Sequence, residues 1–422
     1  MPKIAPFRGI RYNPERVNLH DVIVRIEHLS QGLLRHYYRS GNDLLSLILR
    51  CKDEDSTIRA RKIYYRWLDE GILVKDSQPV IYLYHQEFEH RGKHFVRKGF
   101  VAATLIEPYG EGTVLPHEHI FPEGKEYHLR LMKTLQKNFE QVFVIYSDPN
   151  GEIDSQIQGF AENDPVLEVE DEYGTVHKVW HISDLNVIRS VAQKMSKITG
   201  VIADGHHRYE ASLAYRAEMT KLHGSNGSEG FNFRLINFVR AEDPGLLILP
   251  THRLLKGIKQ PEFQKFIDDA AEFFHVMPVD VESIETALDR DRDRHAFGVY
   301  TRWGSYILRL KDENVMDELC EPNTSKDYRR LDVLILHRLA IEHILKFDGR
   351  IGYERYLEKA ISSVDSGKFD LAFFLNPTRP SEVLRIAMNG EKMPQKSTDF
   401  YPKLVTGLLT LDISPEERVE LP

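Results

Sequence analysis

The segment VIADGHHRYEASLAYRAE, residues 201–218, changes from an apolar strand pattern to a helical pattern across two residues. The apolar run ends at the turn dipeptide Asp204-Gly205, and the pattern predicts a helix from about His206. Strand patterns and helical patterns continue to alternate up to the C-terminus. They include a long helix in RRLDVLILHRLAIEHIL (329–345) and a last strand in KLVTGLLTLDI (403–413). This order of elements predicts a mixed α/β (α+β) fold.

The length of the chain predicts more than one lobe. Its 422 residues are about two to three times the length of a typical single domain. The segment HGSNGSEG, residues 223–230, holds three glycines and two serines and is the strongest candidate for a flexible loop. We therefore expect an N-terminal α/β lobe over 1–222 and a C-terminal α/β lobe over 231–422.

The charge and the cysteine content restrict which binding partners and which cellular compartment we expect. The chain has 56 Lys and Arg against 64 Asp and Glu, a net charge of −8, which disfavours general binding to nucleic acid or to anionic membranes. Two cysteines, Cys51 and Cys320, have no paired spacing, and no apolar run is long enough to span a bilayer. We expect a cytoplasmic protein whose partners are neither nucleic acid nor membrane.

The strand–turn–helix at 201–218 is the first candidate site. The first N–H groups of a helix and its positive dipole end form a natural anion site. Asp204, Gly205, His206, His207 and Arg208 stand at that point, and the arginine fork suits a phosphate. The alternative is a purely structural turn with an aspartate cap and solvated histidines.

The second candidate site is the motif Pro116-His117-Glu118-His119. In an extended segment His117 and His119 lie on one side, which is compatible with one metal ion. Two surface imidazoles are the simpler alternative. Glu118 could also act as an acid or base beside a phosphate.

Two further stretches carry polar groups next to strand patterns. In EKMPQKSTDFYPK, residues 391–403, a lysine and two hydroxyls resemble a phosphate-holding set, although the glycine pattern of a Walker A motif is absent. The residues of interest there are Gln395, Lys396, Ser397, Thr398 and Lys403. The alternative is an exposed polar loop.

The stretch LPTHRLLK, residues 249–256, follows a buried-strand pattern. It offers His252 and Arg253 as substrate-binding or accessory groups. A strand end with solvated polar residues would explain the same pattern.

Five segments together resemble the domain of unknown function 1015 family of bacterial and archaeal cytosolic proteins. They are PFRGIRYNPERV (6–17), PHEH (116–119), IADGHHRYEAS (202–212), DPGLLILPTHRLL (243–255) and MPQKSTDFYPKLVTGL (393–408). The resemblance spans nearly the whole chain, so 1–422 is expected to be one family-wide unit. The family has no assigned reaction.

The DGHHR core also resembles the phosphate-contacting turn of the ParB/sulfiredoxin-like fold, which occurs in free-serine kinases. This second resemblance implies a phosphate-binding lobe of that fold. It also implies phosphoryl transfer that involves a small hydroxylated metabolite such as serine or phosphoserine.

The chain departs from the family pattern at two places. Residues 24–28 read VRIEH where members have Ala-Pro-Pro-Tyr-Asp. Ile120 replaces a threonine, and residues 125–128 read KEYH where members have Lys-x-Asp-Arg. If the lost groups held substrate or metal, this copy is altered or inactive.

These patterns predict a nucleotide-dependent phosphotransferase acting on a small hydroxylated metabolite. His206 or Glu118 would transfer the proton, and Mg²⁺ bound with ATP or ADP would have Asp204 or Glu118 as ligands. The remaining phosphate or nucleotide ligands would be Gly205, His207, Arg208, Gln395, Lys396, Ser397 and Thr398, with His117, His252 and Arg253 as accessory groups. The alternatives are a phosphatase of the same metabolite and a non-catalytic nucleotide- or metabolite-binding protein. The oligomeric state is left open.

Overall fold

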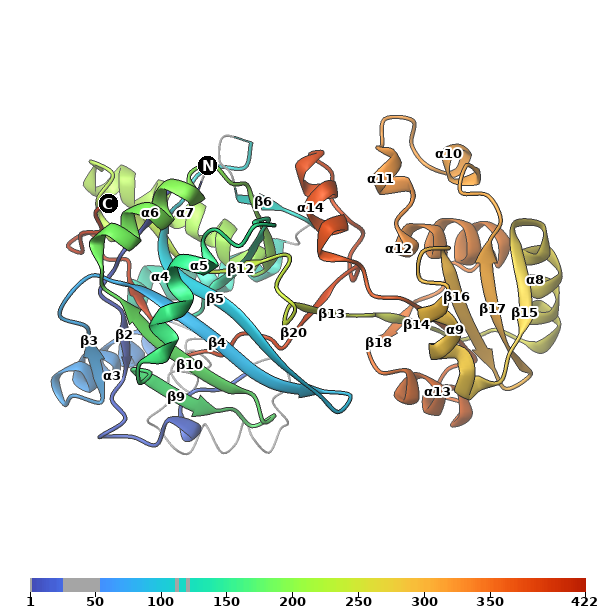
Figure 1. Ribbon diagram of the computed structural model, residues 1–422, viewed down its shortest axis with the longest axis horizontal. Helices are drawn as coiled ribbons and strands as arrows, with labels where there is room; N and C mark the ends of the chain where they lie inside the picture. The colour runs from blue at the N-terminus through green and yellow to red at the C-terminus, as the bar shows by residue number, and fades with distance from the viewer. Residues whose placement is uncertain (1, 26–53, 111–113, 119–121) are drawn as a thin grey trace. The chain divides into compact units, whose positions relative to one another are not determined.

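The structure is a computed structural model that describes residues 2–25, 54–110, 114–118 and 122–422 (Figure 1). The chain forms two compact units. Unit 1 comprises Met1–Pro116, Ile120–Leu247 and Pro402–Pro422, and unit 2 comprises His117–His119 and Ile248–Tyr401. Each unit contains its own sheet and its own helices, so the predicted mixed α/β fold is confirmed.

Unit 1 is built on a nine-stranded sheet in the order β6-β11-β8-β12-β5-β4-β10-β9, with β1 added beside β5. Most neighbours are antiparallel, while β6 with β11 and β8 with β12 are parallel. The strands are β1 (Ile4–Ala5), β4 (Ile81–His90), β5 (Lys93–Leu105), β6 (Val114–Pro116), β8 (Val142–Tyr146), β9 (Leu167–Glu170), β10 (Val176–Ile182), β11 (Gly200–Asp204) and β12 (Phe233–Arg240).

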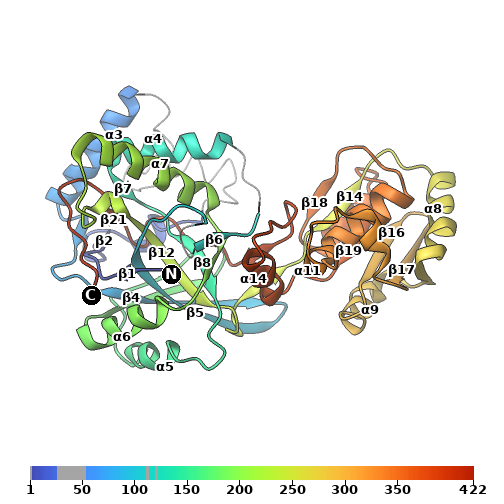
Figure 2. The same ribbon diagram turned by 90° about the horizontal axis from the view of Figure 1, so that it is seen from above.

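Helices cover both faces of this sheet (Figure 2). Val101 and Ala103 of β5 pack on the side of α3 (Glu54–Asp69), α4 (Pro122–Leu135) and α7 (His206–His223). Phe100 and Ala102 point the other way, because successive residues of a strand alternate between its faces. On that side lie α5 (Asp154–Ile157) and α6 (Leu185–Met195).

Shorter elements complete unit 1. β2 (Ile10–Tyr12) pairs with β3 (Leu73–Lys75), β7 (Lys137–Asn138) pairs with β21 (Leu411–Asp412), and the 3-10 turns are η1 (Leu19–Asp21), η3 (Gln158–Glu162) and η4 (Gly230–Asn232). The strand predicted over 403–413 is therefore wrong except at β21. Its apolar residues other than Leu404 are buried, but Gly407 adopts a φ of 87°, which interrupts the extended backbone.

Unit 2 contains a six-stranded antiparallel sheet in the order β15-β17-β16-β19-β14-β18. Its strands are β14 (His252–Leu255), β15 (Phe274–Pro278), β16 (Ala296–Thr301), β17 (Gly304–Leu310), β18 (Gly352–Glu354) and β19 (Leu371–Leu375). A separate ribbon pairs β13 (Leu247–Leu249) with β20 (Asp399–Tyr401).

Both faces of the unit 2 sheet are also covered. Ala372 and Phe374 pack with residues of α9 (Ile284–Arg290) and α13 (Leu357–Asp365), whereas Phe373 contacts Phe266 of α8 (Gln260–Phe273). The helix predicted over 329–345 consists of α12 (Asp332–Ile335) continued by a π-helix, η6 (Leu336–Ile344). The other helices are α10 (Val315–Leu319), α11 (Lys326–Arg329), α14 (Pro380–Met388) and the 3-10 turn η5 (Val281–Ser283).

Within the described ranges, no helix combines the length and the apolar composition needed to cross a membrane.

Candidate functional site

The predicted strand–turn–helix at 201–218 is confirmed. Strand β11 ends at Asp204 and helix α7 begins at His206 and runs for 18 residues. Val201 and Ile202 are fully buried in the sheet, so the strand holds the start of the helix in a fixed position. The N-cap residue is Gly205, not Asp204. A glycine has no side chain to occupy the positive end of the helix.

Gly205 is required by two independent features of the turn. Its φ of 96° lies in the left-handed region, which L-residues with a Cβ atom adopt at a cost. A Cβ atom at this position would also lie only 2.8 Å from Nε and 3.0 Å from Nη2 of Arg208. The Arg208 guanidinium therefore lies directly against the backbone at the start of α7.

The carboxylate of Asp204 holds this guanidinium. Arg208 Nη2 donates a 2.6 Å hydrogen bond to Asp204 Oδ2. Burial alone would raise the pKa of Asp204, but the charges of Arg208, Lys403 and His206 hold that pKa well below its usual value. Asp204 is thus ionised at neutral pH and orients Arg208.

Lys403 links the C-terminal motif to this turn. It belongs to the part of the motif that lies in unit 1, and its charge acts on Asp204. Its carbonyl oxygen accepts a 3.3 Å hydrogen bond from Gln86 Nε2 on β4. Lys403 thus brings a positive charge from the end of this motif to Asp204 inside unit 1, while the predicted grouping of Lys396 with Asp204 stays a prediction.

Glu140 is a second carboxylate beside Arg208. Its Oε2 atom lies 3.6 Å from Arg208 Nη1, and its Oε1 atom accepts a 3.0 Å hydrogen bond from the Thr406 hydroxyl. The backbone oxygen of Glu140 accepts a hydrogen bond from Arg234 Nη2. Glu140 thus connects the helix start with β12.

Two buried arginines, Arg97 and Arg234, add positive charge near Asp204 and Arg208. Arg97 of β5 donates a 3.0 Å hydrogen bond to Gln86 Oε1 and a 2.6 Å bond to the carbonyl of Pro402. Burial lowers the pKa of Arg97 to about 10 and that of Arg234 to about 9. Both side chains therefore remain protonated at neutral pH.

The charges around the start of α7 do not balance. Among the described residues, four cations, Arg97, Arg208, Arg234 and Lys403, interact with one another or with three carboxylates, Asp204, Asp243 and Glu140. This excess of positive charge occurs in a chain with a net charge of −8. A positive region with low solvent access attracts a small anion more strongly than the average surface would.

The neighbouring histidines are packed, not solvated. His206 is 5% exposed. The His207 ring lies on Gly124 of α4, where a Cβ atom would come within 2.8 Å of Cγ, and no described residue satisfies its buried Nδ1 atom. Burial lowers the pKa of His128, also on α4, to about 4, with Arg208 and Arg234 opposing protonation further. The alternative of solvated histidines is therefore wrong for His206.

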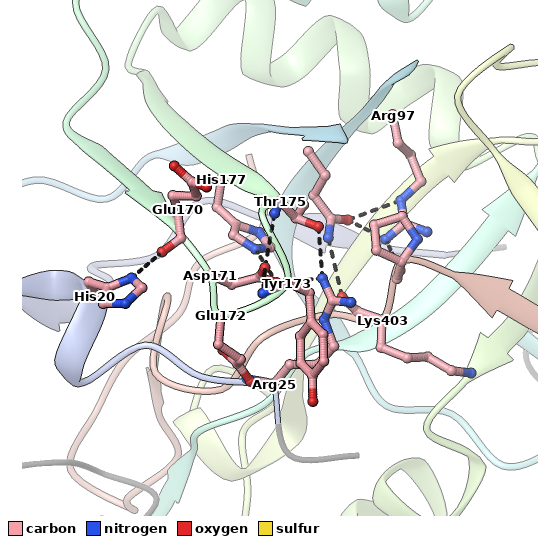
Figure 3. Close-up of polar contacts among 12 residues, drawn as sticks. His20, Arg25, Arg97, Glu170, Asp171, Glu172, Tyr173, Thr175, His177 and Lys403 are labelled. Atoms are coloured by element: carbon pink, nitrogen blue, oxygen red, sulfur yellow. Dashed lines mark hydrogen bonds and ion pairs between the residues drawn. The ribbon is translucent and has the colours of Figure 1, made fainter. Parts of the chain in front are cut away.

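A buried polar network on β4 and the β9–β10 hairpin lies near Arg97 (Figure 3). Arg25 forms an ion pair with Asp171 and donates a 2.8 Å hydrogen bond to Thr175 Oγ1. Asp171 Oδ2 also lies 3.2 Å from His177 Nε2, and His177 Nδ1 hydrogen-bonds to the Tyr84 hydroxyl at 2.7 Å. The network therefore holds Arg25, the last residue of the first described range, in place.

Most residues of the C-terminal motif lie in unit 2. Thr398 Oγ1 hydrogen-bonds to His117 Nε2 at 2.9 Å, and the Ser397 hydroxyl donates to the carbonyl of Pro394 at 2.5 Å. Gln395 and Lys396 are exposed. The motif is therefore a structured turn in which two hydroxyls already have protein partners.

Other predicted groups of unit 2 are buried. His117 is 1% exposed, so the alternative of a surface imidazole is wrong for it. His252 packs edge-on against Phe374, and Arg253 is fully buried. The alternative of a solvated strand end is wrong for both. Glu118 pairs with Met393 through a parallel backbone bridge.

The predicted metal ligands Asp204 and Glu118 belong to different units. Among the described residues, no group of three or more His, Cys, Asp or Glu side chains is placed to hold a metal ion. Asp204 lies in unit 1 and is paired with Arg208, while Glu118 lies in unit 2. His119 is outside the described residues. Mg²⁺ carried by a nucleotide is bound mainly by phosphates and water, so it stays a prediction.

The structure thus brings Asp204, Gly205, His206, His207 and Arg208 together in unit 1, and His117, Arg253 and residues 395–398 together in unit 2. The proposed single site that combines both groups stays a prediction. Sequence reasoning missed Arg97, Glu140 and Arg234. The only signal for the two arginines is a charged residue within an apolar strand pattern, in FVRKGF and FNFRLIN.

Comparisons with solved structures found distant similarity. A mutant form of a free serine kinase in complex with ADP is 14% identical, with a TM-score of 0.35 over 72% of this chain and 90% of that chain. SbnI with C-terminal truncation from Staphylococcus aureus is 11% identical, with a TM-score of 0.36 over 74% and 87%. A conserved hypothetical protein from Pyrococcus furiosus is 15% identical, with a TM-score of 0.32 over 72% and 93%.

No curated protein matches the sequence. A family model does match, over residues 4–334, and it is described as a protein of unknown function, DUF1015. It covers most of unit 1, including the strand–turn–helix that carries the candidate site, and much of unit 2. The chain belongs to the DUF1015 family.

Proposed function

We propose that unit 1 binds the phosphate of a nucleotide at the start of α7, and that the protein is a nucleotide-dependent phosphotransferase acting on a small hydroxylated metabolite. The observation that carries this proposal is the position of Arg208 against Gly205. A left-handed glycine at the N-cap, the first turn of α7 and an oriented guanidinium occur at one point. Together they offer backbone and side-chain donors to one anion.

The surrounding charges support the same ligand. Arg208 and Lys403 would contact phosphate oxygens, while the buried Arg97 and Arg234 would contribute a fixed positive field. Asp204 and Glu140 hold Arg208 in place before the ligand arrives. Preorganised cations of this kind are the main requirement of phosphoryl transfer, because the protein contributes positioning and electrostatic stabilisation.

The reaction requires one proton acceptor. The substrate hydroxyl oxygen would form a bond to the terminal phosphorus of the nucleotide, while the bond from that phosphorus to the bridging oxygen breaks. The hydroxyl proton would pass to His206 in its neutral form, which is buried beside Asp204. Serine is one metabolite of this class, and phosphoserine would be its product.

A second candidate is nucleotide binding without turnover. His128 stands where the family has an arginine, and its lowered pKa keeps it neutral at physiological pH. The site therefore has one cation fewer than the family pattern implies. Loss of one positive group at a phosphoryl-transfer site reduces catalysis more than binding.

Calorimetric titration of the full chain with ATP and ADP, followed by product analysis with serine, tests both candidates. Binding with formation of phosphoserine supports the phosphotransferase. Binding of ATP or ADP without product in a panel of hydroxylated metabolites supports the second candidate. Release of phosphate from phosphoserine without a nucleotide indicates the phosphatase alternative. Absence of nucleotide binding contradicts the phosphotransferase and second-candidate proposals.

A further inference from the structure

A small cavity lies inside unit 1, where α4, β7 and β12 meet. Its volume is about 20 Å³, which is enough for one ligand of about the size of a water molecule. Apolar side chains form part of the wall, and the polar part consists of His128, Lys137, Asn138, Glu140 and Arg234. The hydrogen bonds of these polar groups indicate which ligand the cavity suits.

Arg234 brings a buried positive charge to the cavity. The residue is 2% exposed, and its Nη2 and Nη1 atoms donate to the carbonyl oxygen of Glu140 and, at 3.5 Å, to the hydroxyl of Ser212. Both acceptors are uncharged. The buried Nε atom has no hydrogen-bond partner among the described residues. A buried guanidinium in such surroundings is costly unless a negative charge compensates it.

The charged neighbours do not supply this compensation. Burial lowers the pKa of Arg234 to about 9, and the charge of Arg208 lowers this pKa more than the charge of Glu140 raises it. The Glu140 carboxylate faces Arg208, with 3.6 Å between Oε2 and Nη1. Lys137, the other cation of the wall, already forms a 3.0 Å ion pair with Asp412. The uncompensated charge at the cavity is therefore that of Arg234.

Asn138 offers a second unused donor to the same cavity. It is 2% exposed, and its Oδ1 atom accepts a 3.2 Å hydrogen bond from the backbone N–H of Leu235. This bond identifies the other amide atom as Nδ2, which has no partner in the part of the chain that the structure describes. Among the lining residues, the unsatisfied buried atoms are Asn138 Nδ2 and Arg234 Nε, and both are donors. Native structures rarely leave such groups without an acceptor.

We propose that this cavity binds one small monovalent anion of the size of chloride, with Arg234 Nε and Asn138 Nδ2 as its donors. A chloride ion is little larger than a water molecule, accepts from both donors and neutralises the guanidinium. Water would satisfy the donors but would leave the buried charge uncompensated. A phosphate group is too large for this volume, so the site differs from the one proposed at the start of α7.

The anion would also support the neighbouring charges. Arg234 holds the backbone of Glu140, and the carboxylate of Glu140 faces Arg208. An ion that fixes Arg234 would therefore help to keep this carboxylate in position. The anion site itself does not depend on the proposed function, because no nucleotide takes part in it.

Bromide identifies the ligand directly, because it replaces chloride and scatters anomalously. Crystals of the full chain soaked in sodium bromide should show an anomalous peak within hydrogen-bonding distance of Arg234 Nε and Asn138 Nδ2. Bromide peaks elsewhere on the surface would show that the ion entered the crystal. In such a crystal, water or empty space in the cavity would overturn the proposal.

Thermal unfolding tests the same site in solution. The wild type should melt about 2 °C or more higher in sodium chloride than in sodium gluconate of equal ionic strength, because gluconate is too large for the cavity. Asn138→Asp keeps the acceptor for Leu235 and places a carboxylate beside Arg234, so this difference should disappear. Asn163→Asp, at an exposed position, is the matched control and should keep it. Equal differences in all three proteins would reveal a general salt effect and contradict the anion site.

A second variant covers the case in which Asn138→Asp does not fold. Asn138→Ala removes one donor and adds no charge, so about tenfold more chloride should be needed for the same rise in melting temperature. The chloride dependence is compared within each protein, so a lower starting stability of the variant does not affect the result. If Asn138→Ala responds to chloride at the same concentrations as the wild type, Asn138 is not a ligand and the proposed site is wrong.

Discussion

Arg208 lies against Gly205 so closely that a single added methyl group at position 205 would come within 2.8 Å of its Nε atom. The two residues are three positions apart, and the first turn of α7 brings them together. Asp204, on the other side of the glycine, accepts a hydrogen bond from the same guanidinium. The adjacent residues Asp204 and Gly205 thus set the direction in which Arg208 presents its donors.

Replacing Arg208 by lysine should weaken nucleotide binding. Lysine keeps the charge but loses the planar fork, and one charge-assisted hydrogen bond is worth about 1.5–3 kcal/mol. We expect a loss of about tenfold to a hundredfold in ADP affinity by calorimetric titration. Arg66→Lys on the exposed side of α3 is the control and should bind normally. Unchanged affinity in Arg208→Lys would show that the turn is only structural.

Gly205→Ala should impair both stability and binding, and Gly71→Ala should impair stability alone. Both glycines have a positive φ, 96° and 71°, so each substitution should cost about 1–2 kcal/mol of unfolding free energy. A Cβ atom at Gly71 meets nothing within 4 Å, whereas one at Gly205 displaces Arg208. Urea denaturation and ADP titration of both variants separate the two effects. Equal ADP affinities would contradict the importance of the close approach.

The stability of the protein should fall as pH decreases from about 6.5 to about 4. His128 has a folded-state pKa of about 4, so in this window the unfolded chain binds a proton that the folded chain excludes. The unfolded state is then favoured as pH falls, by roughly 2–3 kcal/mol for one such histidine. His128→Gln should flatten the pH dependence, measured by denaturation at several pH values. His94→Gln, at an exposed position, should leave the slope as it is in the wild type.

Asp171→Asn should destabilise unit 1 strongly. The change leaves the buried Arg25 guanidinium facing an amide that cannot neutralise it, which costs about 3–5 kcal/mol. Asp269→Asn breaks the exposed ion pair with Lys265 and should cost less than about 1 kcal/mol. Urea denaturation compares the two variants. Similar midpoints would mean that the network of Figure 3 contributes little to folding.

The local sequence was sufficient to predict the turn that carries the candidate site. The apolar run, the Asp-Gly dipeptide and the following helical pattern act over neighbouring residues, and the structure confirms all three. The strand predicted over 403–413 failed for a reason that is also local. Gly407 has a positive φ, and the segment contributes its apolar residues to the core of unit 1 without extended pairing over its whole length.

The residues that surround the turn at Gly205 depend on pairing between segments that are distant in sequence. Arg234 of β12 lies opposite Thr104 of β5, and Arg97 of β5 lies opposite Gln86 of β4, because these strands pair in a fixed register. A shift of one residue would turn each arginine to the other face. Lys403 joins Asp204 because residues 402–422 return to unit 1 after the chain has completed unit 2.

The sequence by itself determined the family, the mixed α/β composition and the conformation around Gly205, because each depends on contiguous motifs or on short-range periodicity. The tertiary structure alone decided that Glu140 and Arg234 flank Arg208, and that Arg253 supports Lys396. Residue type and spacing cannot show these relationships. They arise from burial and strand register, which depend on the packing of the whole unit.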